Sequence, residues 1–165
     1  MNGMAVTDAH KPTRPLPTLI GNQAAASDPA SHVWLAASAG TGKTQVLSAR
    51  VYRLLLRGVD PGAILCLTFT KAGAAEMADR INDRLARWVR MAERDLKADL
   101  IALGEDPEPA VLALARRLFA RVLDAPGGGI RIQTIHGFVR RCFRPSRWRR
   151  GWSPVSARLR RARKR

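Results

Sequence analysis

The chain has 165 residues, 46% of them hydrophobic and 5% aromatic, which is enough for one domain with a modest core. No apolar stretch approaches the ~18 residues of a membrane span, and the first residues show no signal-peptide pattern, so we expect neither membrane attachment nor export. Cys66 and Cys142 are too few for a disulfide framework or a zinc site, which favours a reduced, cytoplasmic setting. The net charge of +16 points to nucleic acid, but 12 of the 29 Lys and Arg residues lie in 137–165, where there is no Asp or Glu.

The first third of the chain predicts a leader, a short strand and a helix. Residues 1–20 contain three prolines and predict a disordered leader, and residues 22–29 predict a short helix or turn. The apolar run at 32–36 predicts a buried strand. After a glycine-rich turn, residues 43–57 carry apolar side chains at helical spacing, and Gly58 ends this helix.

The remainder alternates strands with helices. Residues 63–70 are nearly all apolar, as in a parallel strand covered on both faces. Residues 73–89 have helical spacing, with two acidic residues placed four positions before two arginines, Glu76 before Arg80 and Asp83 before Arg87. A helix that starts at Pro109 leads to a third strand at 130–135. This alternation predicts an α/β fold with a parallel sheet.

The glycine-rich turn has the composition and setting of a phosphate-binding loop. Residues 37–44 read ASAGTGKT, after a predicted strand and at the start of a helix. Gly40 and Gly42 allow a tight turn whose backbone N–H groups point at one anion, beside the positive end of the helix. Lys43 can reach the β- and γ-phosphates of a nucleotide, and the Thr44 hydroxyl can bind Mg²⁺. Ala37 replaces the glycine of the strict pattern, and the alternative is a glycine-rich turn with a surface lysine.

Hydroxyl and aromatic side chains follow the second and third predicted strands. Thr68-Phe69-Thr70 ends one strand and Thr134-Ile135-His136-Gly137-Phe138 follows the other, at the edge where open α/β sheets bind ligands. Hydroxyls and a lysine there can hold phosphates of a nucleic-acid strand, and a phenylalanine can stack on a base. The alternative is that both phenylalanines are core residues and that the histidine is a hydrogen-bonded helix cap.

Taken in order, the motifs resemble those of the UvrD-type superfamily 1 helicases: Gln23, ASAGTGKT at 37–44, LTFTKAGAAEM at 67–77 and IQTIHGF at 132–138. Within that family the sequence is most similar to the AddA subunit of the AddAB helicase–nuclease. The resemblance covers about 21–138 and implies the N-terminal part of the ATP-binding domain: a partial P-loop, RecA-like parallel sheet with flanking helices, lacking the second motor domain. It implies ATP-dependent 3′→5′ DNA unwinding in double-strand break repair, with ATP and Mg²⁺ as cofactors. The implied partner of the intact protein is an AddB-like nuclease subunit.

The resemblance also implies residue roles. Gln23 is similar to a glutamine that contacts adenine. Many members have Asn-Lys where this chain has Lys71-Ala72, so the lysine of this chain lies one place earlier. Alanine at the first loop position is common in the family. The implied ATP site also contains Ala37, Ser38, Ala39, Gly40, Thr41, Gly42, Lys43 and Thr44, with Thr44 on Mg²⁺. The implied contacts to single-stranded DNA are Thr68, Phe69, Thr70, Lys71, Thr134 and His136.

The sequence after Phe138 departs from the family. Helicases of this type use an Asp-Glu pair to hold Mg²⁺ and to position the attacking water, and residues 137–165 contain no carboxylate. We therefore expect an incomplete chain that binds nucleotide but does not hydrolyse it or unwind DNA alone. Residues 139–165 predict a disordered basic tail, with the composition of a GC-rich gene read out of frame. The alternative is a genuine tail that grips phosphates, with Trp148 and Trp152 stacking on bases.

Two functions from other classes remain open. One is a P-loop nucleotide-binding protein that is not a helicase, such as a kinase, with Asp60 or Asp124 as its catalytic acid. The other is a non-catalytic basic module that binds nucleic acid and no ATP. ATP binding separates this module from the other two functions, and an effect of single-stranded DNA on ATP affinity separates a helicase fragment from a kinase.

Overall fold

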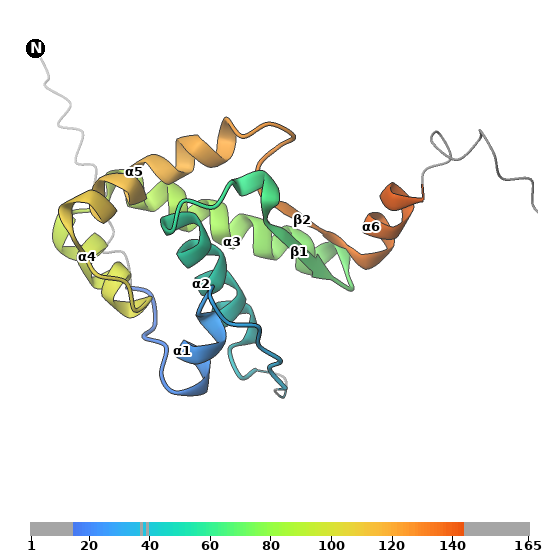
Figure 1. Ribbon diagram of the computed structural model, residues 1–165, viewed down its shortest axis with the longest axis horizontal. Helices are drawn as coiled ribbons and strands as arrows, with labels where there is room; N and C mark the ends of the chain where they lie inside the picture. Colours follow the sequence, from blue (N-terminus) through green and yellow to red (C-terminus); the bar gives the residue numbers. More distant parts are fainter. Residues whose placement is uncertain (1–14, 37, 39, 144–165) are drawn as a thin grey trace, which may run out of the picture.

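The computed structural model of the chain describes residues 15–36, 38 and 40–143. Most of the predicted leader and of the basic tail therefore lie outside the described residues. Six helices and one parallel pair of strands are arranged as in Figure 1. No helix in this part of the chain is long and apolar enough to cross a membrane. The helices are α1 (Asn22–Ser27), α2 (Lys43–Leu56), α3 (Lys71–Arg90), α4 (Glu93–Ala102), α5 (Pro109–Leu123) and α6 (Ile135–Cys142), and the strands are β1 (Leu65–Thr68) and β2 (Arg131–Thr134).

Most predicted elements are present, with local changes at their ends. Helix α2 begins at Lys43 and α5 at Pro109, as predicted. Strand β1 is shorter than predicted because side-chain caps start another element on either side of it. Asp60 accepts a hydrogen bond from the Gly62 N–H at 2.9 Å and starts a 3₁₀ turn, while the Thr70 hydroxyl accepts from the Gly73 N–H at 3.0 Å and starts α3. Helix α4 was not predicted.

The two strands pair in parallel, and the chain passes from β1 to β2 through α3, α4 and α5 (Figure 1). Leu65 is paired with Arg131 and Thr68 with Thr134. The predicted strand at 32–36 is wrong, because those residues form no strand and pair with no strand in the described part of the chain. Without a hydrogen-bonded neighbour the apolar run stays uncovered, and Trp34 is 94% exposed.

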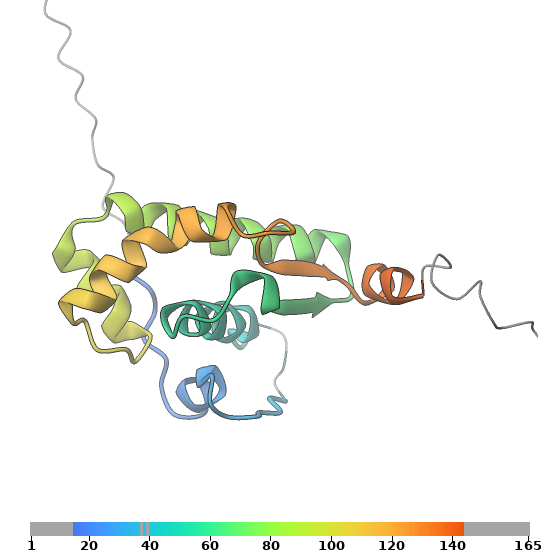
Figure 2. The same ribbon diagram turned by 45° about the horizontal axis from the view of Figure 1, so that its top comes forward.

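The prediction that the second strand is covered on both faces is also wrong. Leu65 is 42% and Leu67 is 46% exposed, while Cys66 between them is partly buried against the core. Burial raises the pKa of the Cys66 thiol. The apolar composition of β1 therefore reflects one covered face and one open face, because within the described residues α3 packs on the sheet and no helix lies opposite it. Figure 2 shows this arrangement.

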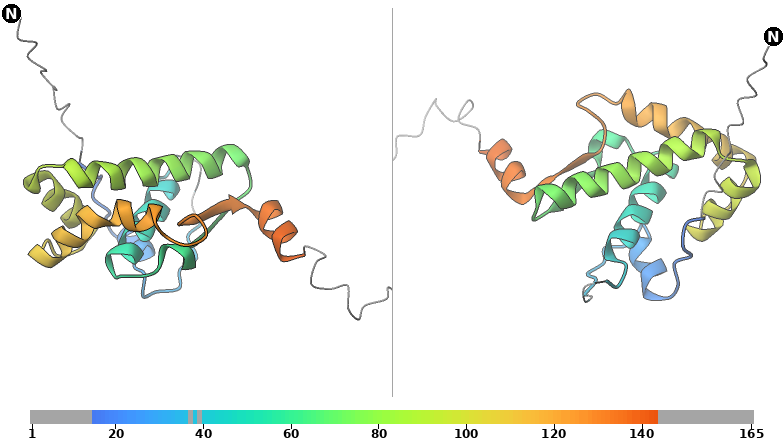
Figure 3. Two further views of the ribbon diagram at one scale, coloured as in Figure 1. Left: turned by 90° about the horizontal axis from the view of Figure 1, so that it is seen from above. Right: turned by 180° about the vertical axis from the view of Figure 1, so that it is seen from behind.

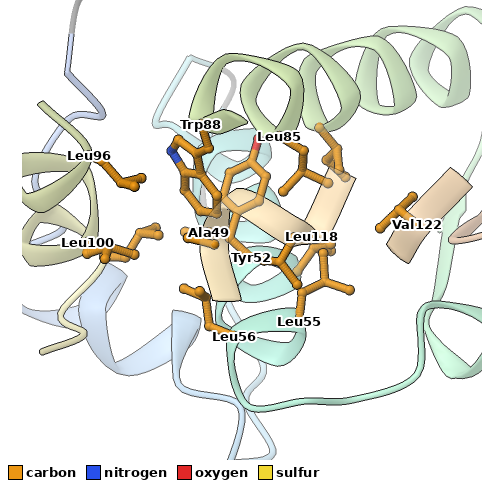
Figure 4. Close-up of a cluster of buried hydrophobic side chains, with 14 of the residues drawn as sticks. Ala49, Tyr52, Leu55, Leu56, Leu85, Trp88, Leu96, Leu100, Leu118 and Val122 are labelled. Carbon is orange, nitrogen blue, oxygen red and sulfur yellow. The ribbon is translucent and has the colours of Figure 1, made fainter. Parts of the chain in front are cut away.

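The main core lies between helices rather than on the sheet (Figure 4). Tyr52 of α2 and Trp88 of α3 are its largest fully buried side chains, and their rings pack with centroids 5.3 Å apart and planes inclined by 54°. Leu96 and Leu100 of α4 and Leu118 of α5 complete the cluster and are fully buried. Each buried leucine contributes about 1.5–3 kcal/mol of burial free energy, so these helices hold α2 and α3 in place.

The last residues of the predicted leader are packed, not disordered. The Leu16 N–H donates to the carboxylate of Asp99 at 2.8 Å, and Leu19 is buried against the core. The Gln45 side chain donates to the Pro17 carbonyl at 3.1 Å. The expectation of disorder is therefore wrong for residues 15–20, because polar contacts to α2 and α4 anchor this segment.

Helix α6 follows β2 and stands away from the helical core (Figure 3). None of its residues is buried, and it includes 139–142, the first four residues of the predicted disordered tail. Their helical backbone corrects that prediction for these four positions. The rest of the tail from residue 144 onward, including Trp148 and Trp152, lies outside the described residues.

Candidate functional site

The phosphate loop meets α2 through two glycines in the left-handed backbone region. Gly40 has φ 80° and Gly42 has φ 82°, a conformation that other residues rarely adopt. Gly42 is the residue before α2, so the loop turns into the helix there. A Cβ at Gly42 would also lie 3.6 Å from the side-chain nitrogen of Gln23. The backbone conformation at these two positions therefore accounts for the glycines. Ala37 and Ala39 of the predicted site lie outside the described residues.

The polar groups of the loop converge on the Ser38 carbonyl. The Thr41 hydroxyl donates to it at 2.7 Å, and the Lys43 ammonium donates to it as well. Thr44, on the first turn of α2, is exposed. The lysine is thus held against the backbone of the loop.

Gln23 lies against the loop, although 18 residues separate it from Thr41. Its side-chain nitrogen donates to the Thr41 carbonyl at 3.4 Å. Helix α1 supplies this contact and packs beside α2. The structure therefore brings together the two segments that the sequence assigned to one nucleotide site.

Three arginines, two on α2 and one directly after its last residue, fix the segment that follows Gln23. Arg50 donates to the carbonyls of Ala26, Asp28 and Ser31 at 3.2, 2.6 and 2.7 Å. Arg53 donates to the Ser27 hydroxyl at 2.8 Å and pairs with Glu105 at 2.7 Å, and Arg57 pairs with Asp28 at 3.2 Å. Sequence reasoning missed this arginine clamp, formed by Arg50, Arg53 and Arg57, although their spacing of three and four residues places them along one side of a helix.

The carboxylate of Asp28 is stabilised at the centre of this clamp. The Ala30 N–H donates to it at 3.1 Å, and this hydrogen bond is the largest of the causes that lower the pKa of Asp28. The charge of Arg57 and the Ser31 hydroxyl act in the same direction. The charged form of the Asp28 carboxylate therefore stabilises the turn after α1.

A cavity of about 440 Å³ lies beside the loop. Lys43 and Arg50 give it positive charge, and its other lining residues are His32 and apolar side chains that include Val33 and Leu47. Its volume falls in the range of small-ligand sites, and its mixture of cations and apolar surface suits a phosphate-bearing ligand with a base. No group of three or more His, Cys, Asp or Glu side chains that could hold a metal is found in the described residues, so Mg²⁺ would depend on the Thr44 hydroxyl and on the phosphates.

The second group of predicted site residues meets at one edge of the sheet. Thr68 and Thr134 are paired in register as the last residues of their strands. The Thr134 hydroxyl accepts a hydrogen bond from the Gly137 N–H at 3.1 Å and caps α6, as Thr70 caps α3. Two Thr-x-x-Gly turns therefore lie side by side, each at the start of a helix.

The exposure of this edge decides between two interpretations of its aromatic residues. Phe69 is 87% exposed, so the alternative that it is a core residue is wrong. Phe138 is half-buried. His136 and Lys71 are exposed, and the cap of α6 is Thr134, so the alternative that the histidine is the cap is also wrong. Phe69 is thus presented on the surface next to two capped helix starts.

Asp99 organises the opposite end of the molecule and was missed by sequence reasoning. Its carboxylate is fully buried and accepts hydrogen bonds from the Trp88 indole at 2.7 Å, from Arg84 at 3.0 Å and from the Leu16 N–H. It joins α4 to α3 and to the segment before Gln23. Its sequence context gave no signal, because its partners come from two other parts of the chain, helix α3 and the segment before α1.

The parallel strand pair, its helical connection and the glycine loop before α2 are consistent with the N-terminal domain of a helicase. Comparison with known families agrees: the profile of the UvrD/REP helicase N-terminal domain matches residues 20–158. The chain belongs to this family. The match extends through the segment in which the sequence predicted a loss of reading frame, and that prediction stays a prediction.

Relatives with curated names give the same result. The chain is 37% identical over 123 residues to the AddA subunit of the ATP-dependent helicase/nuclease from Latilactobacillus sakei, covering 74% of this chain and 12% of the relative. It is 34% identical over 125 residues to the protein of that name from Pelotomaculum thermopropionicum, covering 74% of this chain and 8% of the relative. These names confirm the predicted similarity to AddA, and the chain spans about a tenth of the length of these relatives. No solved structure gave a significant match.

Proposed function

We propose that this chain binds ATP with Mg²⁺ at the loop before α2 and single-stranded DNA at the carboxyl ends of β1 and β2. The observation that carries the nucleotide site is the contact between Gln23 and the Thr41 carbonyl, which joins the predicted adenine-binding and phosphate-binding segments. Lys43 would hold the β- and γ-phosphates, Gln23 the base and Thr44 the metal. Bound Mg²⁺ would neutralise phosphate charge.

The proposed DNA site rests on the paired strand ends. Thr68, Thr70 and Thr134 present hydroxyls there, and Phe69 presents an exposed ring. Exposed Lys71 and His136 lie at the starts of the two helices that follow. Hydroxyls and helix N-termini bind phosphates, while an aromatic ring stacks on a base without sequence preference.

We propose further that residues 137–165 contribute no catalytic carboxylate to ATP hydrolysis. The residues after Phe138 supply neither of the carboxylates that such hydrolysis needs. The intact protein would be a 3′→5′ helicase of double-strand break repair that acts with an AddB-like nuclease subunit. Sequencing the gene beyond codon 136 in all three frames tests this: another frame encoding an Asp-Glu motif supports it, and the absence of such a frame makes the basic tail a genuine part of the protein.

ATP binding by the full chain is the decisive experiment. We expect Lys43→Ala to abolish saturable binding of a fluorescent ATP analogue in the presence of Mg²⁺. Lys97→Ala, which removes a half-buried lysine paired with Glu93, should leave this binding unchanged. A single-stranded oligonucleotide should change the ATP affinity of the parent chain. Binding that survives Lys43→Ala would contradict the proposed site.

The structure disfavours both candidate acids of the kinase alternative. Asp60 caps a 3₁₀ turn before β1 and Asp124 follows α5 before β2, so both precede the strands and neither lies at a carboxyl end. The alternative of a DNA-binding module without nucleotide would show unchanged DNA binding in Lys43→Ala and no ATP binding by the parent chain.

A further inference from the structure

A second cavity lies across α2 from the phosphate loop. It has a volume of about 280 Å³ and is lined by Gln45, Ser48, Ala49 and Tyr52 of α2, together with α3 and the segment before α1. The cavity beside the loop is lined instead by α2 residues at 43, 46, 47 and 50. Each α2 residue that lines the second cavity lies two positions from a residue that lines the first, and two positions on a helix correspond to a rotation of about 200°. The two cavities therefore occupy opposite faces of α2.

One wall of this cavity contains a buried hydroxyl without a partner. Ser48 is 3% exposed, and its Oγ is the buried side-chain polar atom without a hydrogen-bond partner within the described residues. An unsatisfied buried hydroxyl is costly, and native structures contain few of them. A polar group entering the cavity would satisfy it.

The opposite wall is strongly cationic. Arg80, Arg84 and Arg87 of α3 line the cavity with a single carboxylate, that of Asp83. Arg80 pairs with Glu76 at 2.9 Å, as predicted, and Arg84 pairs with buried Asp99. The predicted pair of Asp83 with Arg87 does not form in this structure; both side chains line the cavity instead. Arg87 is therefore available to a ligand.

The remaining wall is apolar. Leu16, Leu19 and Leu103 contribute aliphatic side chains, and Tyr52 contributes its ring while its hydroxyl donates to the Arg80 carbonyl at 3.2 Å. Burial raises the pKa of Tyr52, so its hydroxyl stays protonated and keeps this donor role. A ligand that fits must combine an anionic group for the arginines with a small apolar body for the leucines.

We propose that this cavity binds a small organic anion, a phosphate monoester or a carboxylate on an apolar group. Arg87 would hold the anionic group, Ser48 would donate a hydrogen bond to it, and the leucines would cover the apolar part. The site is separate from the proposed nucleotide site, because it faces away from Lys43.

The test uses the full chain carrying Lys43→Ala, so that the phosphate loop no longer contributes. We expect phenyl phosphate, benzoate or both to bind saturably by calorimetry at fixed ionic strength, and phenol not to bind. The stronger of the first two identifies the anionic group. Absence of saturable binding by both overturns the proposal, and so does competition by ATP in the parent chain, which would make the cavity part of the nucleotide site.

Two variants locate the bound anion. We expect Arg87→Gln to weaken binding about tenfold or more, since a charge-assisted hydrogen bond is lost. Arg90→Gln, on the same helix outside the cavity, should leave binding unchanged. Ser48→Ala should weaken binding and yet raise the melting temperature of the unliganded chain, because it removes the unsatisfied hydroxyl. Binding unaffected by both Arg87→Gln and Ser48→Ala overturns the proposal.

Discussion

Thr68 and Thr134 are register partners at the ends of β1 and β2, but the chain leaves the two strands differently. Thr134 is both the last residue of β2 and the cap of α6. The cap of α3, in contrast, is Thr70, two residues after Thr68, the last residue of β1. The additional residues are Phe69 and Thr70. This difference places Phe69 outside the core, where its ring is 87% exposed.

Phe69→Ala is expected to weaken binding of a single-stranded oligonucleotide without destabilising the fold. Loss of one stacked base corresponds to about 1–3 kcal/mol of binding free energy, while replacement of an exposed side chain changes stability by less than about 0.5 kcal/mol. Fluorescence anisotropy and urea unfolding measure the two effects. Leu123→Ala, at a residue that is 63% exposed on α5, is the matched control and should change neither. Equal DNA affinity of the two variants would refute the assigned role of Phe69.

Thr70→Ala should reduce the free energy of unfolding by about 1 kcal/mol, because it removes the hydroxyl that accepts from the Gly73 N–H at the start of α3. Thr70→Ser keeps the acceptor and should restore most of this loss. Urea unfolding followed by circular dichroism compares the two variants. If serine and alanine were equally destabilising, the methyl group rather than the hydrogen bond would account for the effect.

Asp99→Ala should be the most destabilising of these substitutions, costing about 3–5 kcal/mol, since it leaves the Arg84 charge and the Trp88 indole without their shared acceptor. A loss of that size is a large fraction of the stability of a small domain. Thermal unfolding monitored by circular dichroism measures it. Asp106→Ala, in the exposed loop between α4 and α5, is the control and should change little. A small effect of Asp99→Ala would show that α4 is not held by this carboxylate.

The turn after α1 should loosen in acid. The pKa of Asp28 is lowered from its ordinary value of 3.8, so its stabilising contribution is complete above that value and is lost as the pH falls through the lower folded-state pKa. The difference in unfolding free energy between the parent chain and Asp28→Asn should therefore be present at pH 6 and should shrink below pH ~4. A difference that stayed constant across this range would contradict the assigned hydrogen bonds.

Alkylation should distinguish the two cysteines. Burial raises the pKa of Cys66, and the thiolate is the reactive form, whereas Cys142 is exposed on α6. Iodoacetamide at pH 8 should therefore modify Cys142 first, and modification of Cys66 should accelerate in urea. Mass spectrometry of the Cys66→Ser and Cys142→Ser variants measures each rate separately. Equal rates in the folded chain would mean that β1 does not pack against the core as described.

The parts of the fold that were predicted correctly have local signals. Gly42 and the helical spacing after it predict the turn and α2, and Pro109 predicts the start of α5. The alternation of strands and helices predicts that β1 and β2 are parallel. The strand at 32–36 was wrong because an apolar run indicates burial but says nothing about whether a neighbouring strand is available to pair with it.

The candidate site likewise has one part that could be predicted from the sequence and one part that could not. The proximity of Gln23 to the phosphate loop followed from the order of motifs, which the family resemblance supplied. Neither the arginine clamp nor the burial of Asp99 could be predicted, because both depend on which distant segments pack together. Asp99 is one of several carboxylates on a charged helix in the sequence, and only its contacts with Leu16, Arg84 and Trp88 set it apart.

Both ends of α3 are fixed by side chains from outside the usual helix ladder. Thr70 caps its first turn, and Arg116 of α5 donates to the Val89 and Met91 carbonyls at 3.1 and 3.0 Å at its last turn. A helix of 20 residues is about 30 Å long, so α3 spans the distance from the sheet edge to the end of the helix that carries Trp88. Because Trp88 of α3 packs on Tyr52 of α2, one continuous helix joins the sheet edge next to Phe69 to the helix that follows the phosphate loop.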